Sequence, residues 1–89
     1  RYYDEEGFVF GYPSVVEADL LVTDGEHLLM EIKSSISRAD VFELWRLGQL
    51  YERRAGVKLK LIVISPFVRK EARKAAEELG IEVYSGHEL

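Results

Sequence analysis

The sequence predicts a single α/β domain built on a mixed sheet, with antiparallel strands first and strands alternating with helices afterwards. Three observations support this: an apolar hairpin in the first half, a capped amphipathic helix in the middle and a strand–helix–strand unit at the end. A chain of 89 residues is long enough for one domain with a modest core. We therefore expect residues 1–89 to form one domain.

Two strands rich in Val, Leu and Ile are predicted at Val15–Thr23 and His27–Lys33, with Asp24-Gly25-Glu26 as the turn between them. A shorter strand is expected before them at Gly7–Gly11, so that the three strands form an antiparallel meander. The polar residues Arg1–Glu6 are expected to fray.

The length of the turn decides which residues of the hairpin face each other. A two-residue loop pairs Asp19 with Met30, whereas a three-residue loop pairs Asp19 with Glu31. We favour the longer loop, because it gives one wholly apolar strand face and gathers the charged side chains on the other.

A helix is predicted at Arg38–Ala55, where apolar residues recur at helical spacing. Ser37 and Asp40 have the spacing of a capping box at its beginning, and Gly56 ends it.

The last third of the chain predicts a strand, a helix and a strand, at Leu59–Ser65, Phe67–Leu79 and Ile81–Tyr84. The first of these strands becomes continuously apolar, as buried central strands do. Ser65-Pro66 resembles a helix N-cap followed by proline at the first helical position. Because helices connect these strands, we expect parallel pairing through right-handed crossovers.

The composition narrows the class of protein. The absence of cysteine argues against disulfides and thiolate metal sites, and favours a reducing, cytoplasmic setting. No apolar run reaches membrane-span length, and no signal-peptide pattern opens the chain. Few amide residues and many charged ones follow the trend of thermophile proteins.

Charge is distributed unevenly along the chain, whose net charge is −4. Residues 1–36 hold eight acids and two bases, whereas residues 37–89 hold eight acids and ten bases. Metal-binding carboxylates are therefore expected in the first half. The second half contains basic side chains of the kind that contact phosphate, although we interpret most of them as solvent-exposed residues of helices.

Asp19, Glu31 and Lys33 are the candidate catalytic residues. Two carboxylates and a lysine are the groups that metal-dependent phosphodiester hydrolysis needs, because Mg²⁺ and Mn²⁺ prefer oxygen ligands. The competing interpretation is a charged hairpin face without catalytic function, in which Glu17 pairs with Lys33 across the strands.

These residues, in this order of elements, resemble the PD-(D/E)XK nuclease superfamily, which has the restriction-endonuclease-like fold. That family carries an Asp on its second core strand and Glu-x-Lys on its third, as do Asp19 and Glu31-Ile32-Lys33 here. Gly-Phe-Val-Phe-Gly before the motif and the strand–Ser-Pro–helix unit after it also fit, so the resemblance covers about residues 7–84. Archaeal Holliday-junction-resolvase-like nucleases and uncharacterised archaeal C-terminal domains are the most similar in pattern.

The sequence departs from the family pattern in three places. Ala18 rather than proline precedes Asp19. The family's first helix is missing or lies upstream of Arg1, so we expect the chain to be the C-terminal part of a longer protein. Gln49 and Tyr51 are two residues apart rather than four, so the family's Gln-x-x-x-Tyr motif is not carried over.

The resemblance implies a metal-dependent nuclease that acts on DNA, including branched DNA. It implies that Asp19, Glu31 and the main-chain carbonyl of Ile32 bind Mg²⁺ or Mn²⁺, and that Lys33 holds or activates the attacking water. Because cutting two strands favours paired sites, a homodimer is expected. The accessory candidates are Glu17, Ser34 and Gln49.

Two other interpretations remain open. One is a non-catalytic module of the same fold that binds nucleic acid or protein, which the acidic balance and the absent first helix favour. The other is a small α/β domain in which the three residues come together by accident. A sheet that places Asp19 and Glu31 on opposite faces would support the accidental interpretation.

Overall fold

The computed structural model describes residues 2–7, 9, 11–12, 14–16 and 18–86. Strands and helices within these ranges follow the order β-β-β-β-α-β-α-β. They are β1 (Tyr2–Asp4), β2 (Ser14–Val16), β3 (Asp19–Thr23), β4 (Glu26–Ile32), α1 (Arg38–Ala55), β5 (Leu59–Ser65), α2 (Lys70–Leu79) and β6 (Glu82–Ser85).

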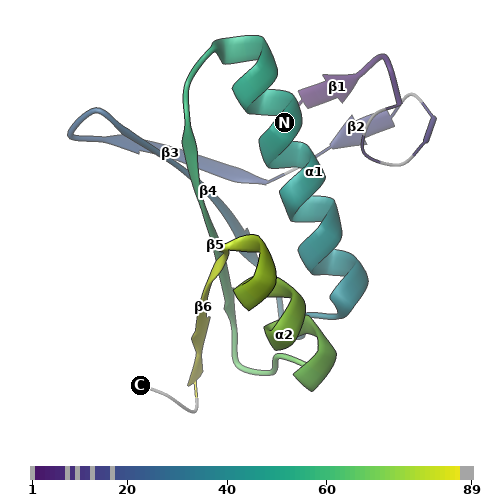
Figure 1. Cartoon of the computed structure of the whole chain (residues 1–89), viewed down its shortest axis with the longest axis vertical. Helices are drawn as coiled ribbons and strands as arrows, with labels where there is room; N and C mark the ends of the chain where they lie inside the picture. Colours follow the sequence, from purple (N-terminus) through teal and green to yellow (C-terminus); the bar gives the residue numbers. More distant parts are fainter. Residues whose placement is uncertain (1, 8, 10, 13, 17, 87–89) are drawn as a thin grey trace.

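The main sheet has four strands in the order β3-β4-β5-β6. The β3–β4 pair is antiparallel, whereas β4–β5 and β5–β6 are parallel, each joined by a helix. Both helices pack on one face of this sheet (Figure 1). The predicted mixed α/β architecture is therefore confirmed.

The core lies between the two helices and the helix-facing side of the sheet. Val63 on β5 is fully buried there, and Leu50 of α1 and Ala76 of α2 are also fully buried. The buried apolar residues are Val9, Leu29, Ile36, Val41, Leu44, Leu47, Leu50, Val63, Ala72, Ala75, Ala76 and Ile81. The small alanines of α2 let that helix approach the sheet and α1 closely.

The β3–β4 hairpin has the shorter loop, so the predicted register is wrong. Thr23 pairs with Glu26, and Asp19 lies opposite Met30 rather than opposite Glu31. Asp24 (φ 52°) and Gly25 (φ 77°) both have left-handed backbone, as a two-residue turn of the primed type requires. Such a turn matches the twist of the flanking strands, and this local preference outweighs the formation of one uniformly apolar face.

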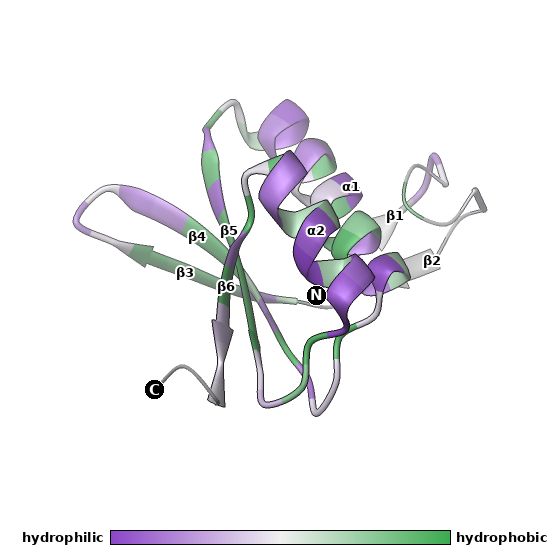
Figure 2. Cartoon of the chain, turned by 60° about the horizontal axis from the view of Figure 1, so that its bottom comes forward, coloured by the Kyte–Doolittle hydropathy of each residue, from purple (hydrophilic) through white to green (hydrophobic). Residues whose placement is uncertain are grey.

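No helix of the described residues covers the other face of the sheet, so apolar side chains on that face do not determine the register of the hairpin. Pleating places Leu21, Ile32, Ile64 and Tyr84 on this open face, because Leu29 and Val63 occupy the helix-facing side. These four side chains are 36–57% exposed. Figure 2 shows β3 largely in the hydrophobic colour although it is an edge strand. Apolar side chains therefore occupy both faces of the hairpin.

The segment before the hairpin also differs from the prediction. A strand over Gly7–Gly11 is wrong, because Gly7 (φ 66°) and Gly11 (φ 85°) have left-handed backbone and Gly11 N–H donates to Gly7 O at 2.8 Å. Phe8 and Phe10 of that segment lie outside the described residues. Tyr2–Asp4, expected to fray, instead pairs with Ser14–Val16.

Two predicted elements have different boundaries. The strand expected over Val15–Thr23 is interrupted at Ala18, which belongs to neither β2 nor β3. The helix expected from Phe67 begins three residues later, at Lys70. The reason is that Val68 pairs with Ile36 in an isolated parallel bridge, which takes the chain away from helical geometry.

A test of the face assignment compares two neighbouring residues of β5. We expect Val63→Ala to lower the free energy of unfolding by about 2 kcal/mol, because it removes buried methyl groups and leaves a cavity. Ile64→Ala removes more carbon atoms but from the open face, and should cost clearly less. Urea unfolding followed by circular dichroism measures both, and equal losses would contradict the assignment.

Candidate functional site

The candidate site is built at the C-terminal end of β4. Glu31 shares the helix-facing side with Leu29 and is half-buried. Lys33, the next residue but one, follows directly after the strand, and its backbone N–H donates to Ile64 O on β5 at 3.2 Å. The parallel pairing with β5 therefore holds the Glu-x-Lys segment in place.

Lys33 is joined to the beginning of α1 by an ion pair. Its Nζ lies 3.0 Å from Oδ1 of Asp40. The other carboxylate oxygen of Asp40 accepts from the backbone N–H of Ser37 at 2.8 Å, and Ser37 Oγ accepts from the N–H of Asp40 at 3.2 Å. The predicted capping box is confirmed, and its acidic residue also fixes the lysine of the motif.

Burial raises the pKa of the Glu31 carboxyl above its usual range. The charge of Lys33 opposes this change, whereas the carboxylates of Asp40, Glu43 and Asp19 add to it. The surroundings of Glu31 therefore contain more negative than positive charge, which disfavours its ionised form.

The ion pair shifts both of its members toward the charged state. The hydrogen bond to Asp40 raises the pKa of Lys33, which keeps the ammonium charged. Burial raises the pKa of Asp40, but hydrogen bonds from Ser37 and Lys33 outweigh this and lower it below its usual range. Lys33 is thus a permanent cation next to Glu31 across the neutral pH range.

Asp19 does not face Glu31 directly. Strand alternation places the Asp19 side chain on the open face beside Met30, whereas the Glu31 side chain lies on the helix-facing side. This is the arrangement that supports the accidental interpretation. However, Asp19 is the first residue of β3, next to the interruption at Ala18, and its charge still reaches Glu31 and raises the pKa of that carboxyl.

The remaining candidates are less closely associated with Glu31. Ser34 is exposed in the loop between Lys33 and α1, and Ile32 is the last residue of β4. Gln49 is exposed on α1, about 14 Å along the helix axis from Asp40. Glu17 lies outside the described residues.

The candidate donors are oxygen atoms of the kind that Mg²⁺ prefers, although Asp19 and Glu31 lie on opposite faces of the sheet. Among the residues described, no group of three or more His, Cys, Asp or Glu side chains is arranged to hold a metal ion. Asp19, Glu31 and the carbonyl of Ile32 nevertheless offer only oxygen donors, and Mg²⁺ is commonly bound through one or two carboxylates and several waters. A cation there would also relieve the repulsion around Glu31.

Sequence reasoning missed Asp40 and Glu43 as neighbours of the motif. Asp40 was assigned only to the helix cap, although a helix that begins after a connection of five residues must start close to the end of the strand before it. An acidic residue in its first turn therefore reaches the C-terminal end of β4.

A Glu31→Gln variant tests the electrostatic strain at the site. The folded state raises the pKa of Glu31, so the ionised carboxylate destabilises the fold above that pKa, and protonation removes this penalty as pH falls. We therefore expect Glu31→Gln to unfold at a higher temperature than the native chain at pH 7, with the difference vanishing below about pH 4.

The exposed carboxylate of Glu77, on α2, provides the control. Glu77→Gln changes the net charge equally and should alter stability by no more than about 0.5 kcal/mol. Differential scanning calorimetry across pH measures both variants. A Glu31→Gln variant that is less stable than the native chain at pH 7 would show that the carboxylate has a favourable partner instead.

No helix in the described part of the chain is long and apolar enough to cross a lipid bilayer.

Comparison with known proteins identifies the family. A scan against family models matches residues 14–82 to the PD-(D/E)XK nuclease superfamily, and this span contains the candidate motif and both helices. Neither a search of curated proteins nor a search of solved structures found a match. The four-stranded mixed sheet with two helices is consistent with the restriction-endonuclease-like fold. The chain therefore belongs to the PD-(D/E)XK nuclease superfamily.

Proposed function

We propose that this chain is a nuclease domain that hydrolyses phosphodiester bonds of DNA with Mg²⁺ or Mn²⁺. Membership of the superfamily indicates a nuclease-type function on nucleic acid, and such nucleases generally use divalent metals. The observation that carries the proposal is that Glu31 and Lys33 lie together at the C-terminal end of β4, in a carboxylate-rich setting that favours a cation.

In this proposal, Asp19, Glu31 and the main-chain carbonyl of Ile32 hold the metal. When bound, it polarises the scissile phosphate and stabilises charge at the leaving oxygen. Glu31 supplies a carboxylate whose burial strengthens its attraction for a cation.

Lys33 is proposed to hold the attacking water and to offset the negative charge that develops on phosphorus. Its Nζ donates to Asp40, an interaction that keeps it protonated and limits where the flexible side chain can reach. Because three hydrogens are available on an ammonium group, the bond to Asp40 leaves two for water and phosphate oxygen.

A second candidate function is a non-catalytic nucleic-acid- or protein-binding module of the same fold. One observation favours it: the described residues offer no three-membered ligand group. The placement of Asp19 beside Met30 rather than Glu31 supports instead the interpretation in which the three residues come together by accident. Metal-dependent cleavage distinguishes the two functions, because a binding module retains affinity without turnover.

The homodimer and the preference for branched DNA remain predictions. Sedimentation equilibrium tests the first, and comparing cleavage of a four-way junction with cleavage of the linear duplex of the same sequence tests the second.

Cleavage of supercoiled plasmid with Mn²⁺ tests the proposed function. We expect the native chain to nick the plasmid, and expect Lys33→Met and Glu31→Ala each to lower the rate at least about 100-fold, because each removes a charged group that acts on the reacting phosphate. Lys58→Met and Glu77→Ala repeat the same substitutions at exposed positions and should cleave at the native rate.

Unaltered cleavage by both Lys33→Met and Glu31→Ala would exclude the proposed site. A native chain that leaves every DNA form intact with Mn²⁺ or Mg²⁺ would favour the binding module.

A further inference from the structure

We propose that the groove between the beginning of α1 and α2 binds the sugar–phosphate backbone of the nucleic acid, at the end of the sheet that also holds Glu31 and Lys33. This inference rests on the proposed function, because it assigns to that site the surface that holds its substrate.

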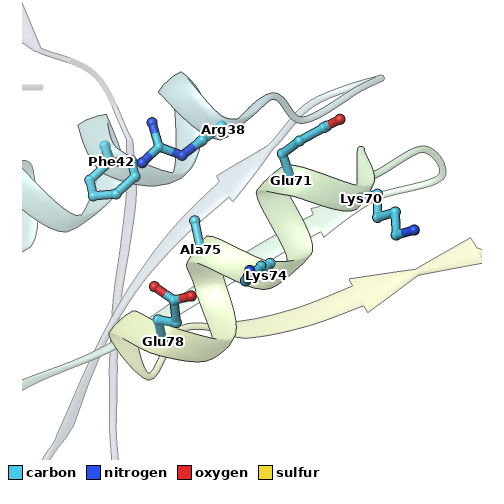
Figure 3. Close-up of a pocket in the computed structure, with 7 residues that line it drawn as sticks. All are labelled: Arg38, Phe42, Lys70, Glu71, Lys74, Ala75 and Glu78. Carbon is cyan, nitrogen blue, oxygen red and sulfur yellow. The ribbon is translucent and has the colours of Figure 1, made fainter.

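The groove has a volume of about 460 Å³ and is open to solvent. Its lining comes from the beginning of α1 and from three turns of α2. The lining residues are Arg38, Phe42, Lys70, Glu71, Lys74, Ala75 and Glu78. In Figure 3, Ala75 points from α2 toward α1, so a small, buried side chain forms the floor of the groove.

Positive charge is concentrated at the beginning of α2. Residues 69–74 hold Arg69, Lys70, Arg73 and Lys74 against one acid, Glu71, in a chain whose net charge is −4. Figure 2 shows α2 mostly in the hydrophilic colour. A locally cationic surface on an acidic protein attracts an anionic polymer only at that place.

Arg38 completes this surface from α1. Its guanidinium lies 4.6 Å from the centre of the Phe42 ring, and Figure 3 shows the two side chains together. Stacking fixes the plane of the guanidinium and leaves its N–H groups to donate to phosphate oxygens. Within the described residues, no ion pair occupies Arg38, Lys70 or Lys74, in contrast to Lys33 and Lys60.

The groove adjoins the candidate site through backbone contacts. Ile36, three residues after Lys33, pairs with Val68, two residues before α2. Ile36 N–H donates to Phe67 O at 2.9 Å, and Arg69 N–H donates to Ile36 O at 3.1 Å. The beginnings of α1 and α2 therefore lie side by side at the same end of the sheet as the C-terminal end of β4 (Figure 1).

Glu78 limits the binding surface to one end of the groove. Glu78 lies eight residues after Lys70, about 12 Å farther along α2 and away from β4. Phosphates are therefore expected over Arg38, Lys70 and Lys74, and not over the last turn of α2. These cations and Lys33 lie at the same end of the sheet, with the first turn of α1 between them.

The test is the salt dependence of binding to a short fluorescein-labelled DNA duplex, measured by anisotropy with Ca²⁺ over a series of KCl concentrations. In Lys70→Gln/Lys74→Gln, affinity should fall, and the slope of log K against log salt should decrease in magnitude by about 1.8, since each lost phosphate contact contributes about 0.9. Arg38→Gln should decrease it by about 0.9.

Matched controls change the net charge equally at positions away from the groove. Lys58→Gln/Lys60→Gln alters two lysines at the opposite end of β5, and Arg53→Gln alters an exposed arginine in the last turn of α1. Both should keep the native slope, and circular dichroism checks that every variant is folded.

Equal changes in the groove variants and their controls would overturn the proposal, as would a native slope in Lys70→Gln/Lys74→Gln. No DNA binding by the native chain would also overturn it. Mn²⁺ binding tests the metal site independently of the groove, because it should be the same in the native chain and in the groove variants. A groove that fails while Mn²⁺ still binds leaves the proposed function standing.

Discussion

The arrangement of this chain depends on the parallel pairing of β4 with β5. That pairing sets Glu31 beside Val63 and Ile32 beside Ile64, and it continues past the strand as the bond from Lys33 N–H to Ile64 O. Parallel strands need a helical crossover, so α1 begins just beyond Lys33 and α2 just beyond β5. The Ile36–Val68 bridge then joins the two connections. One backbone interaction thus places the motif, the capping carboxylate Asp40 and the cationic start of α2 at one end of the molecule.

At that end, the fold tolerates an electrostatic penalty. Glu31 is half-buried among the charges of Asp40, Glu43 and Asp19, and among the described residues Lys33 is the cation that compensates for them. A purely structural role would be served better by an apolar residue or a neutral amide at this position, since buried carboxylates are costly without partners. Such costs are common where a group binds a cation or acts in catalysis. The carboxylate of Asp40 has two roles, because it caps α1 and also binds Lys33.

Much of this arrangement was predictable from the sequence, because local signals and the global fold agree. The apolar strand Leu59–Ser65, the capping box at Ser37 and the glycines that end both helices each indicate their element without tertiary information. The hairpin register was not predictable from strand patterning, because Leu21 and Ile32 lie exposed to solvent on the open face of the sheet. The Asp24-Gly25 turn was the better guide. The ion pair between Asp40 and Lys33 depends on the position of α1 relative to β4. That position follows from the order of the strands in the sheet, which the sequence alone does not give.

The central claim is that Glu31 belongs to a metal site, and calorimetric titration of Mn²⁺ into the native chain and a Glu31→Ala variant tests it without a substrate. We expect saturable binding by the native chain that is lost in Glu31→Ala and kept in Glu77→Ala, whose carboxylate is exposed on α2. No binding by the native chain, or equal binding by native and Glu31→Ala protein, would contradict it.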